Sequence, residues 1–160
     1  MKFIIVTYMY NFDKILRQAW ESGKVMCGVS AGSMCWFTYG NTLDPRILKE
    51  EVNKIDCLGF IDAYLSPHCQ TEGKRESEIS SIKYLDKIGI SLSNCCAIEI
   101  IDGQYRIIKS KPDDDLFVPY ALKTYWENND LYEEEISNTE IFKPSDELLS
   151  KNIMCNKKIK

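Results

Sequence analysis

The sequence predicts a single α/β domain built around a parallel β-sheet. Short apolar, β-branched runs alternate with segments whose apolar residues recur at helical spacing, which is typical of strands joined by crossover helices. A Gly-x-Ser-x-Gly segment at residues 28–32 lies between one such run and one such helix. The chain has 160 residues and is 44% hydrophobic, so it can form the core of one domain.

The first predicted elements follow the order strand, helix, strand, turn, helix. Residues 3–8 form an apolar run that predicts a buried strand. Asn11 is a suitable cap for a helix over residues 12–20, whose apolar side chains fall on one face. Residues 24–27 predict the second strand and residues 31–37 the next helix. This order is that of a parallel sheet with crossover helices.

The rest of the sequence predicts one more helix and several strands. Residues 76–88 carry apolar side chains three positions apart, as on the buried face of a helix. Asp102-Gly103 is a strong signal for a two-residue turn, which joins a strand over residues 95–101 to one over residues 105–109. The remaining elements are a turn and two strands, at residues 40–45, 57–65 and 120–126.

Composition and charge exclude several classes of protein. A formal net charge of −4 disfavours nucleic-acid binding, which requires clustered Lys and Arg. The acidic runs at 113–115 and 133–135 and the basic end at 157–160 are interpreted as solvated segments. No segment has about 18 consecutive apolar residues, and no signal peptide is recognised, so we expect a cytoplasmic protein without membrane contact.

The seven cysteines are expected to be reduced. Their number is odd, and no two of them have the Cys-x-x-Cys spacing that is typical of zinc and redox sites. His68 is the sole histidine, so zinc would have to be bound by widely scattered thiolates. We therefore expect no zinc site, with the cysteines packed as small apolar side chains.

Ser30 is the strongest candidate for a catalytic nucleophile. In a Gly-x-Ser-x-Gly elbow the glycines permit a sharp turn between strand and helix, which lifts the serine hydroxyl to the carboxyl edge of the sheet. The backbone N–H of Ala31, in the first turn of the helix, is then placed to stabilise an oxyanion. The alternative is that Ser30 simply caps the helix, a role that does not require both glycines.

A serine nucleophile needs a base that takes its proton, and His68 is the one histidine available. It follows the predicted end of a strand at Pro67, where its ring can face the carboxyl edge of the sheet. Two acids are candidates for orienting that ring. Asp44 lies in the loop after the elbow helix, and Glu99 lies in a strand where an unpaired carboxylate would be costly. We prefer Asp44 and keep Glu99 as the alternative.

Residues 28–37, GVSAGSMCWF, resemble the elbow of the peptidase E family, the serine peptidases of type S51, which include α-aspartyl dipeptidases. Other segments resemble the family in the same order: the Thr42-Leu43-Asp44 loop, the Ser66-Pro67-His68 strand end, and the strand and hairpin over residues 97–106. The similarity covers residues 12–126. It implies a fold like that of class I glutamine amidotransferases, a three-layer sandwich around a parallel sheet, with a nucleophile elbow and a β-hairpin region toward the C-terminus.

The resemblance also implies an activity, that of a serine exopeptidase acting on Asp-Xaa dipeptides or short peptides with an N-terminal aspartate, without metal or cofactor. Ser30 would be the nucleophile, His68 the base and Asp44 the acid. The aspartyl carboxylate of such a substrate needs a cation. Arg46, beside the acid loop, and Arg75, beside the histidine segment, are the candidates.

The sequence departs from the family pattern at its N-terminus. Family members carry several β-α units and a Gly-Gly-Asn-type turn before the elbow, whereas residues 7–11 contain no glycine, so a second oxyanion donor is not identified. We expect one domain over residues 1–160 without those units, in which a homodimer would cover the exposed face. The alternatives are an inactive or truncated domain that acts as a binding module, and an esterase or amidase that uses the same triad.

Overall fold

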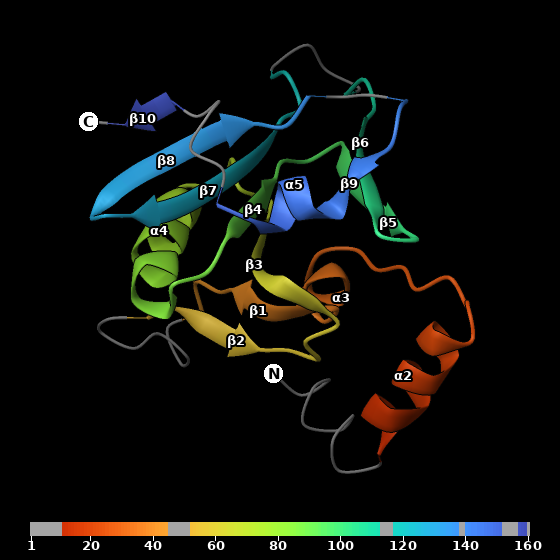
Figure 1. The fold of residues 1–160 in the computed structure, drawn as a ribbon. Helices are drawn as coiled ribbons and strands as arrows, with labels where there is room; N and C mark the ends of the chain where they lie inside the picture. The colour runs from red at the N-terminus through yellow and green to blue at the C-terminus, as the bar shows by residue number, and fades with distance from the viewer. Residues whose placement is uncertain (1–10, 45–51, 113–116, 138–139, 152–156, 160) are drawn as a thin grey trace.

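The computed structural model describes residues 11–44, 52–112, 117–137, 140–151 and 157–159, which form two β-sheets and several helices (Figure 1). The larger sheet has seven strands in the order β10-β8-β7-β4-β3-β1-β2, and the smaller has three in the order β5-β6-β9. The strands are β1 (Phe37–Asn41), β2 (Lys54–Asp56), β3 (Ile61–Pro67), β4 (Gly89–Leu92), β5 (Cys96–Ile101), β6 (Gln104–Lys109), β7 (Ala121–Glu127), β8 (Asp130–Glu135), β9 (Lys143–Pro144) and β10 (Lys157–Ile159). The helices are α2 (Phe12–Glu21), α3 (Ala31–Met34), α4 (Lys74–Leu85) and α5 (Ser145–Leu149).

The three strands in the middle of the larger sheet are parallel. β3 pairs with β1 on one side and with β4 on the other, so that Leu65 lies beside both Gly40 and Ile90. α4 connects β3 to β4 as a crossover helix. The predicted α/β fold around a parallel sheet is therefore confirmed. The outer pairs, β1–β2, β4–β7, β7–β8 and β8–β10, are antiparallel.

The two faces of the larger sheet contact different layers, because successive residues of a strand point to opposite sides. On one face, Ser91 of β4 and Thr124 of β7 accept hydrogen bonds from Arg75 of α4. On the other face, Lys123 of β7 donates a hydrogen bond to the backbone carbonyl of Glu147 in α5. α4 and α5 therefore lie on opposite faces, and the molecule has three layers.

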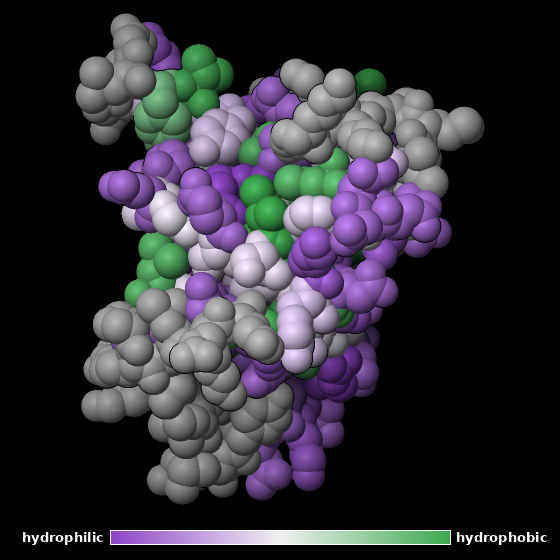
Figure 2. All heavy atoms as spheres, turned by 90° about the vertical axis from the view of Figure 1, so that its left-hand side faces the viewer, coloured by the Kyte–Doolittle hydropathy of each residue, from purple (hydrophilic) through white to green (hydrophobic). Residues whose placement is uncertain are grey.

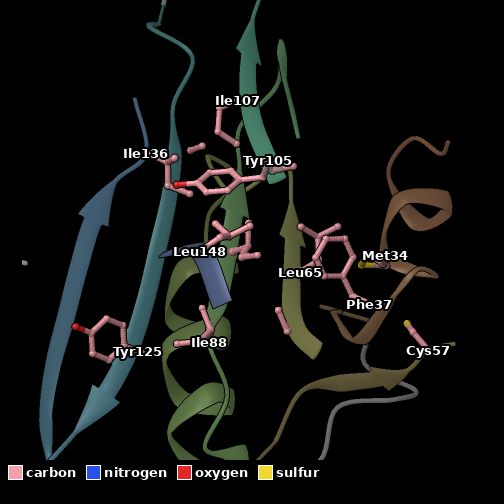
Figure 3. Packing of buried hydrophobic residues seen from close by; sticks show 14 residues of the cluster. Met34, Phe37, Cys57, Leu65, Ile88, Tyr105, Ile107, Tyr125, Ile136 and Leu148 are labelled. Atoms are coloured by element: carbon pink, nitrogen blue, oxygen red, sulfur yellow. The ribbon is translucent and has the colours of Figure 1, made fainter. Parts of the chain in front are cut away.

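The hydrophobic core fills the space between the larger sheet, α3, α5 and the smaller sheet (Figure 3). Leu65 of β3 and Ile90 of β4 are fully buried in the same cluster as Ile107 of β6 and Leu148 of α5. Burial of such a side chain contributes about 1.5–3 kcal/mol. This cluster therefore holds the smaller sheet and α5 against the larger sheet.

One side of the molecule, the left-hand side in Figure 1, is drawn as a surface in Figure 2. In the coloured part of that surface, hydrophobic residues form small separate groups among hydrophilic ones. This part of the surface thus carries no extended apolar patch of the kind that marks an interaction site. In the described part of the chain, no helix has the length and apolar character needed to cross a bilayer.

α2 confirms the helix predicted over residues 12–20, and it lies beside the main body (Figure 1). None of its residues is buried. Trp20 stacks on Phe60 with ring centroids 5.0 Å apart, and the guanidinium of Arg17 lies 4.3 Å from the centroid of the same ring. These contacts attach α2 to the loop that precedes β3.

Three segments around the elbow differ from their predictions. The helix predicted over residues 31–37 is α3, which ends at Met34, and Phe37 belongs to β1. Residues 24–27, predicted as a strand, belong to neither sheet, because the described residues offer no partner strand for their backbone groups; Val25 is 91% exposed. The turn predicted over residues 40–45 is also wrong at its start, because Gly40 belongs to β1. A Cβ on Gly40 would lie 2.8 Å from Met34 Sδ, so this glycine permits close packing of α3 rather than a turn.

The second half of the chain contains more strand than predicted. The helix predicted over residues 76–88 is α4, which ends at Leu85, and the following residues include the unpredicted β4. The acidic run at 133–135 belongs to β8, and the basic end contributes β10, so neither is a solvated tail. Both segments are strands because they pair with each other, and pairing between distant segments leaves no local signal in composition.

The predicted hairpin is confirmed. Asp102 and Gly103 have φ values of 48° and 71°, as a two-residue turn of this kind requires, and they join β5 to β6. The strand predicted over residues 120–126 is β7, and the one over 57–65 is β3, which begins later, at Ile61. The predicted strand at 3–8 and the acidic run at 113–115 lie outside the described residues.

Candidate active site

The backbone bends sharply at Ser30. This residue has φ 55° and ψ −121°, a conformation that residues with a side chain rarely adopt and that is found mainly at functional sites. α3 begins at the next residue, Ala31. A Cβ on Gly28 would lie 2.1 Å from the backbone oxygen of Gly32, so the absence of a side chain at residue 28 is what allows the two ends of the turn to meet.

The hydroxyl of Ser30 does not cap α3. No hydrogen bond joins it to a backbone N–H at the start of the helix. The carbonyl of Ser30 instead accepts hydrogen bonds from the N–H groups of Ser33 (3.0 Å) and Met34 (3.2 Å). Within the described part of the chain, the N–H of Ala31 donates to no acceptor. The serine hydroxyl and the neighbouring N–H are therefore both available to a substrate.

β3 carries His68 just beyond its carboxyl end. The strand ends at Pro67, as predicted, and His68 is exposed with φ 56°. α3 lies against β1 and β3, so the elbow helix contacts the strand that leads to the histidine. Among the described residues, no hydrogen bond joins the Ser30 hydroxyl to the His68 ring.

The ring of His68 is paired with an amide that the sequence analysis did not single out. His68 Nδ1 lies 2.6 Å from Asn94 Oδ1. Asn94 follows β4, the parallel neighbour of β3, in a register that places Leu92 beside Pro67. The signal for Asn94 in the sequence is therefore a polar residue just after β4, the strand that neighbours β3. The sequence analysis missed it because it did not predict β4.

The recorded contacts of the two predicted acids are with other groups than the His68 ring. The backbone N–H of Asp44 donates to Thr42 Oγ1 at 3.1 Å. Glu99 lies on β5 of the smaller sheet, where its carboxylate accepts a hydrogen bond from Arg106 Nε at 2.6 Å. At Nδ1, where a triad acid was expected, the structure has a neutral amide.

Arg75 belongs to a buried charge cluster between α4 and the larger sheet. Its guanidinium pairs with Glu78 at 2.7 Å and with Glu133, and it donates to Ser91 Oγ at 2.7 Å. Glu78 is fully buried, and this burial raises its pKa, although the positive charge of Arg75 opposes the shift. Both terminal nitrogens of Arg75 are thus engaged within the protein. The other predicted substrate-binding residue, Arg46, lies outside the described residues.

Two buried thiols near the elbow, those of Cys35 and Cys57, are not poised as nucleophiles. Burial raises the pKa of Cys35 to about 11 and that of Cys57 to about 12, so both remain protonated near neutral pH. In the part of the chain that the structure describes, no three His, Cys, Asp or Glu side chains are grouped so that they can hold a metal ion.

Comparison with known proteins identifies the family of this chain. "Uncharacterized peptidase YgaJ" of Bacillus subtilis (strain 168) is 33% identical over 106 residues, which are 64% of this chain and 44% of that protein. The chain therefore spans less than half the length of that relative. The model of "Peptidase family S51" matches residues 2–108, a range that includes Ser30, His68 and Asn94. Since this match covers more than half of the sequence, the chain belongs to peptidase family S51.

Proposed function

We propose that this chain carries the nucleophile and base of a serine peptidase that acts on short peptides with an N-terminal aspartate. The bend at Ser30 is the observation that carries the proposal: it has positive φ, it depends on Gly28, and it leaves the hydroxyl without a capping role. Membership in a peptidase family supports hydrolysis of a peptide bond. The aspartyl specificity rests on the resemblance of residues 28–37 to the elbow of α-aspartyl dipeptidases.

The proposed reaction begins with attack of Ser30 Oγ on the carbonyl carbon of the substrate. Its proton passes to Nε2 of His68, the ring nitrogen that does not face Asn94. The N–H of Ala31 donates a hydrogen bond to the oxyanion that forms. His68 then gives the proton to the leaving amine, and a water activated by the same nitrogen hydrolyses the acyl-enzyme.

The side-chain carboxylate of the substrate needs a cationic partner, and arginine suits it through its two parallel donors. Arg75 already pairs with Glu78 and Glu133, and the contacts that engage it favour Arg46 for this role. Asp44 lies two residues before Arg46 in the sequence. In this proposal Arg46 provides the recognition of the aspartyl group.

Substitution of Ser30 tests the proposal directly. The 160-residue protein is assayed with aspartyl p-nitroanilide and labelled with a fluorophosphonate, which reacts with activated serines. Ser30→Ala is expected to lower kcat by at least about 10³-fold and to abolish labelling, because the nucleophile is lost. Ser22→Ala is the control, since Ser22 is an exposed serine at the end of α2; it is expected to change neither.

The possible outcomes separate the alternatives. Turnover that is unchanged in Ser30→Ala contradicts the proposal. Folded wild-type protein with neither turnover nor labelling indicates a binding module of the same fold. Labelling with turnover of esters but not of the aspartyl amide indicates an esterase, and would contradict the substrate class while keeping Ser30 as the nucleophile.

A further inference from the structure

The ring of His68 contacts the side-chain amide of Asn94. His68 Nδ1 and Asn94 Oδ1 are 2.6 Å apart, and the two residues are separated by 26 positions in the sequence. This contact arises from the topology of the sheet. β3 and β4 are parallel neighbours with Pro67 beside Leu92, so the residues that follow the two strands leave the sheet at the same edge. His68 comes directly after β3, and Asn94 comes two residues after β4.

The backbone groups of His68 and Asn94 make hydrogen bonds that fix the position of both residues. The turn at His68 is closed by a hydrogen bond from the N–H of Thr71 to the His68 carbonyl, at 2.9 Å. The backbone N–H of Asn94 donates to Oε1 of Gln70 at 3.1 Å, and the Asn94 carbonyl accepts a hydrogen bond from Ser93 Oγ at 3.0 Å. The side chains therefore meet across two short segments that are themselves fixed, although both residues are exposed.

The segment that carries Asn94 is also tied to the next strand. Ser93 donates its backbone N–H to the carbonyl of Tyr120 at 3.0 Å, and the N–H of Tyr120 donates to Ser93 Oγ at 2.8 Å. Tyr120 directly precedes β7, which pairs with β4. Asn94 is thus held by the larger sheet, and a fixed amide of this kind can orient an imidazole.

We propose that Asn94 is the positioning residue of the catalytic histidine, an inference that rests on the proposed role of His68 as the base. An amide oxygen accepts a hydrogen bond and cannot donate one, so it requires the proton on Nδ1 and leaves the lone pair of Nε2 for the Ser30 proton. It accepts from Nδ1–H both before and after the ring becomes an imidazolium. A Ser-His-Asn set results, in which the partner of histidine is neutral, as in the Cys-His-Asn arrangement of papain-like proteases.

The inference differs from the expected triad in one measurable respect. With Asp44 or Glu99 in this role, a negative charge would stabilise the imidazolium that forms during the reaction. Asn94 orients the ring without that charge. Replacing Asn94 by the isosteric aspartate should therefore keep the tautomer and add a charge that stabilises the imidazolium.

The test uses the fact that His68 is the sole histidine, so that histidine-selective ¹H–¹⁵N NMR reports on this ring alone and does not depend on turnover. The wild-type spectrum is expected to show the neutral ring protonated on Nδ1. Asn94→Ala should lose this preference, and Asn94→Asp should keep it. Asn129→Gly, at an exposed turn with φ 66°, is the control and should leave the spectrum unchanged.

Kinetics give the second readout. Asn94→Ala is expected to lower kcat/KM between about tenfold and 10⁴-fold, the upper bound being the cost of a wrong histidine tautomer in a Ser-His-Asp triad. Asn94→Asp should restore most of this loss, because a carboxylate oxygen accepts the same hydrogen bond from Nδ1. It also keeps the inference testable if Asn94→Ala does not fold, since aspartate has the same shape.

Three results would overturn the inference. The first is a wild-type ring that carries its proton on Nε2. The second is a tautomer that Asn94→Ala leaves unchanged. The third is a change of tautomer in Asp44→Asn without one in Asn94→Ala, which would assign the orienting role to Asp44. A failure of the proposed function is detected by a different experiment, as unchanged turnover in Ser30→Ala. The NMR experiment tests the role of Asn94 independently of that outcome.

Discussion

The two glycines of the elbow have unequal roles at the residue scale. A Cβ on Gly28 would meet the backbone of residue 32 at 2.1 Å, whereas a Cβ on Gly32 would meet no atom within 4 Å among the described residues. Backbone atoms cannot give way as the end of a flexible side chain can. The strained conformation of Ser30 is therefore maintained by the close approach at Gly28, and Gly32 lies in α3 with space beside it.

This difference predicts opposite effects for two matched substitutions. Gly28→Ala should force the turn open, lower the free energy of unfolding by about 1–3 kcal/mol as overpacking does, and abolish fluorophosphonate labelling of Ser30. Gly32→Ala should leave labelling intact and stabilise the protein by up to about 1 kcal/mol, because alanine favours a helix. Urea denaturation and labelling check both, and equal effects of the two substitutions would contradict the assignment.

Candidate site residues stand out in a sequence where a residue type is scarce or a motif is local. Ser30 lies in a five-residue motif, and His68 is the sole histidine, so both are candidates without knowledge of the fold. Asn94 has neither advantage, since it depends on the register between β3 and β4. Arg75 shows the reverse problem: its position near His68 indicates substrate binding, but its guanidinium is engaged by Glu78 and Glu133.

At the scale of elements, α4 is attached to the sheet mainly through polar contacts. Its buried residues are mainly polar: Ser77, Glu78, Ser81 and Ile82. Arg75 links the helix to β4, β7 and β8. A Cβ on Gly89 would lie 2.5 Å from Glu78 Oε1, so the glycine that begins β4 also makes room for this cluster. Removal of one charge would leave the other buried without its partner, which is strongly destabilising.

Two arginine substitutions test this account of α4. Arg75→Ala should lower the free energy of unfolding by about 3–5 kcal/mol, because Glu78 would remain buried without its ion pair. Arg106→Ala is the matched control. Its pair with Glu99 is partly exposed, at 30% and 40% of the two side chains, and should contribute no more than about 1 kcal/mol. Chemical denaturation measures both. A normal stability of Arg75→Ala combined with a raised KM would instead assign Arg75 to the substrate.

Elements were predictable where periodicity or turn chemistry is strong. The amphipathic α2 and the hairpin at Asp102-Gly103 carry strong local signals. The α4 helix was predicted from apolar residues three positions apart, but its buried residues are mainly polar, so its buried face was not predicted. The prediction missed the strands β1, β2, β4, β8, β9 and β10. Of these, β4, β8 and β10 are short or charged, and they exist because the neighbouring strands pair with them. The segment at 24–27 shows the converse, since an apolar run has no strand structure where no described strand pairs with it.

The whole molecule combines a parallel centre with antiparallel additions on both sides, and one apolar cluster joins the two sheets. Met34 of α3, Leu65 of β3, Ile107 of β6 and Leu148 of α5 belong to this cluster, so its members come from both ends of the described chain (Figure 3). A shared core of this kind favours unfolding in one cooperative step. The prediction of a single domain can be tested through that cooperativity.

The cysteines provide probes for this test, because some lie beside the larger sheet and Cys96 lies in the smaller sheet. Cys27 and Cys95 are exposed, and a thiol reagent at pH 8 should modify them within the time that a free thiol needs. Burial raises the pKa of Cys35 and of Cys96 to about 11 and that of Cys57 to about 12. A raised pKa means less thiolate at pH 8, so these three should react only when the structure opens.

Cys35 and Cys57 lie beside the larger sheet, and Cys96 lies in the smaller sheet. If the chain is one cooperative domain, the opening free energies obtained from the modification rates of these three thiols should be equal. Peptide mapping by mass spectrometry across a urea series measures each site separately. Addition of urea should accelerate all three in parallel, with Cys27 as the internal control that stays fast throughout. Modification of Cys96 at lower urea than Cys35 and Cys57 would contradict the prediction, because it would show that the smaller sheet opens while the larger sheet remains folded.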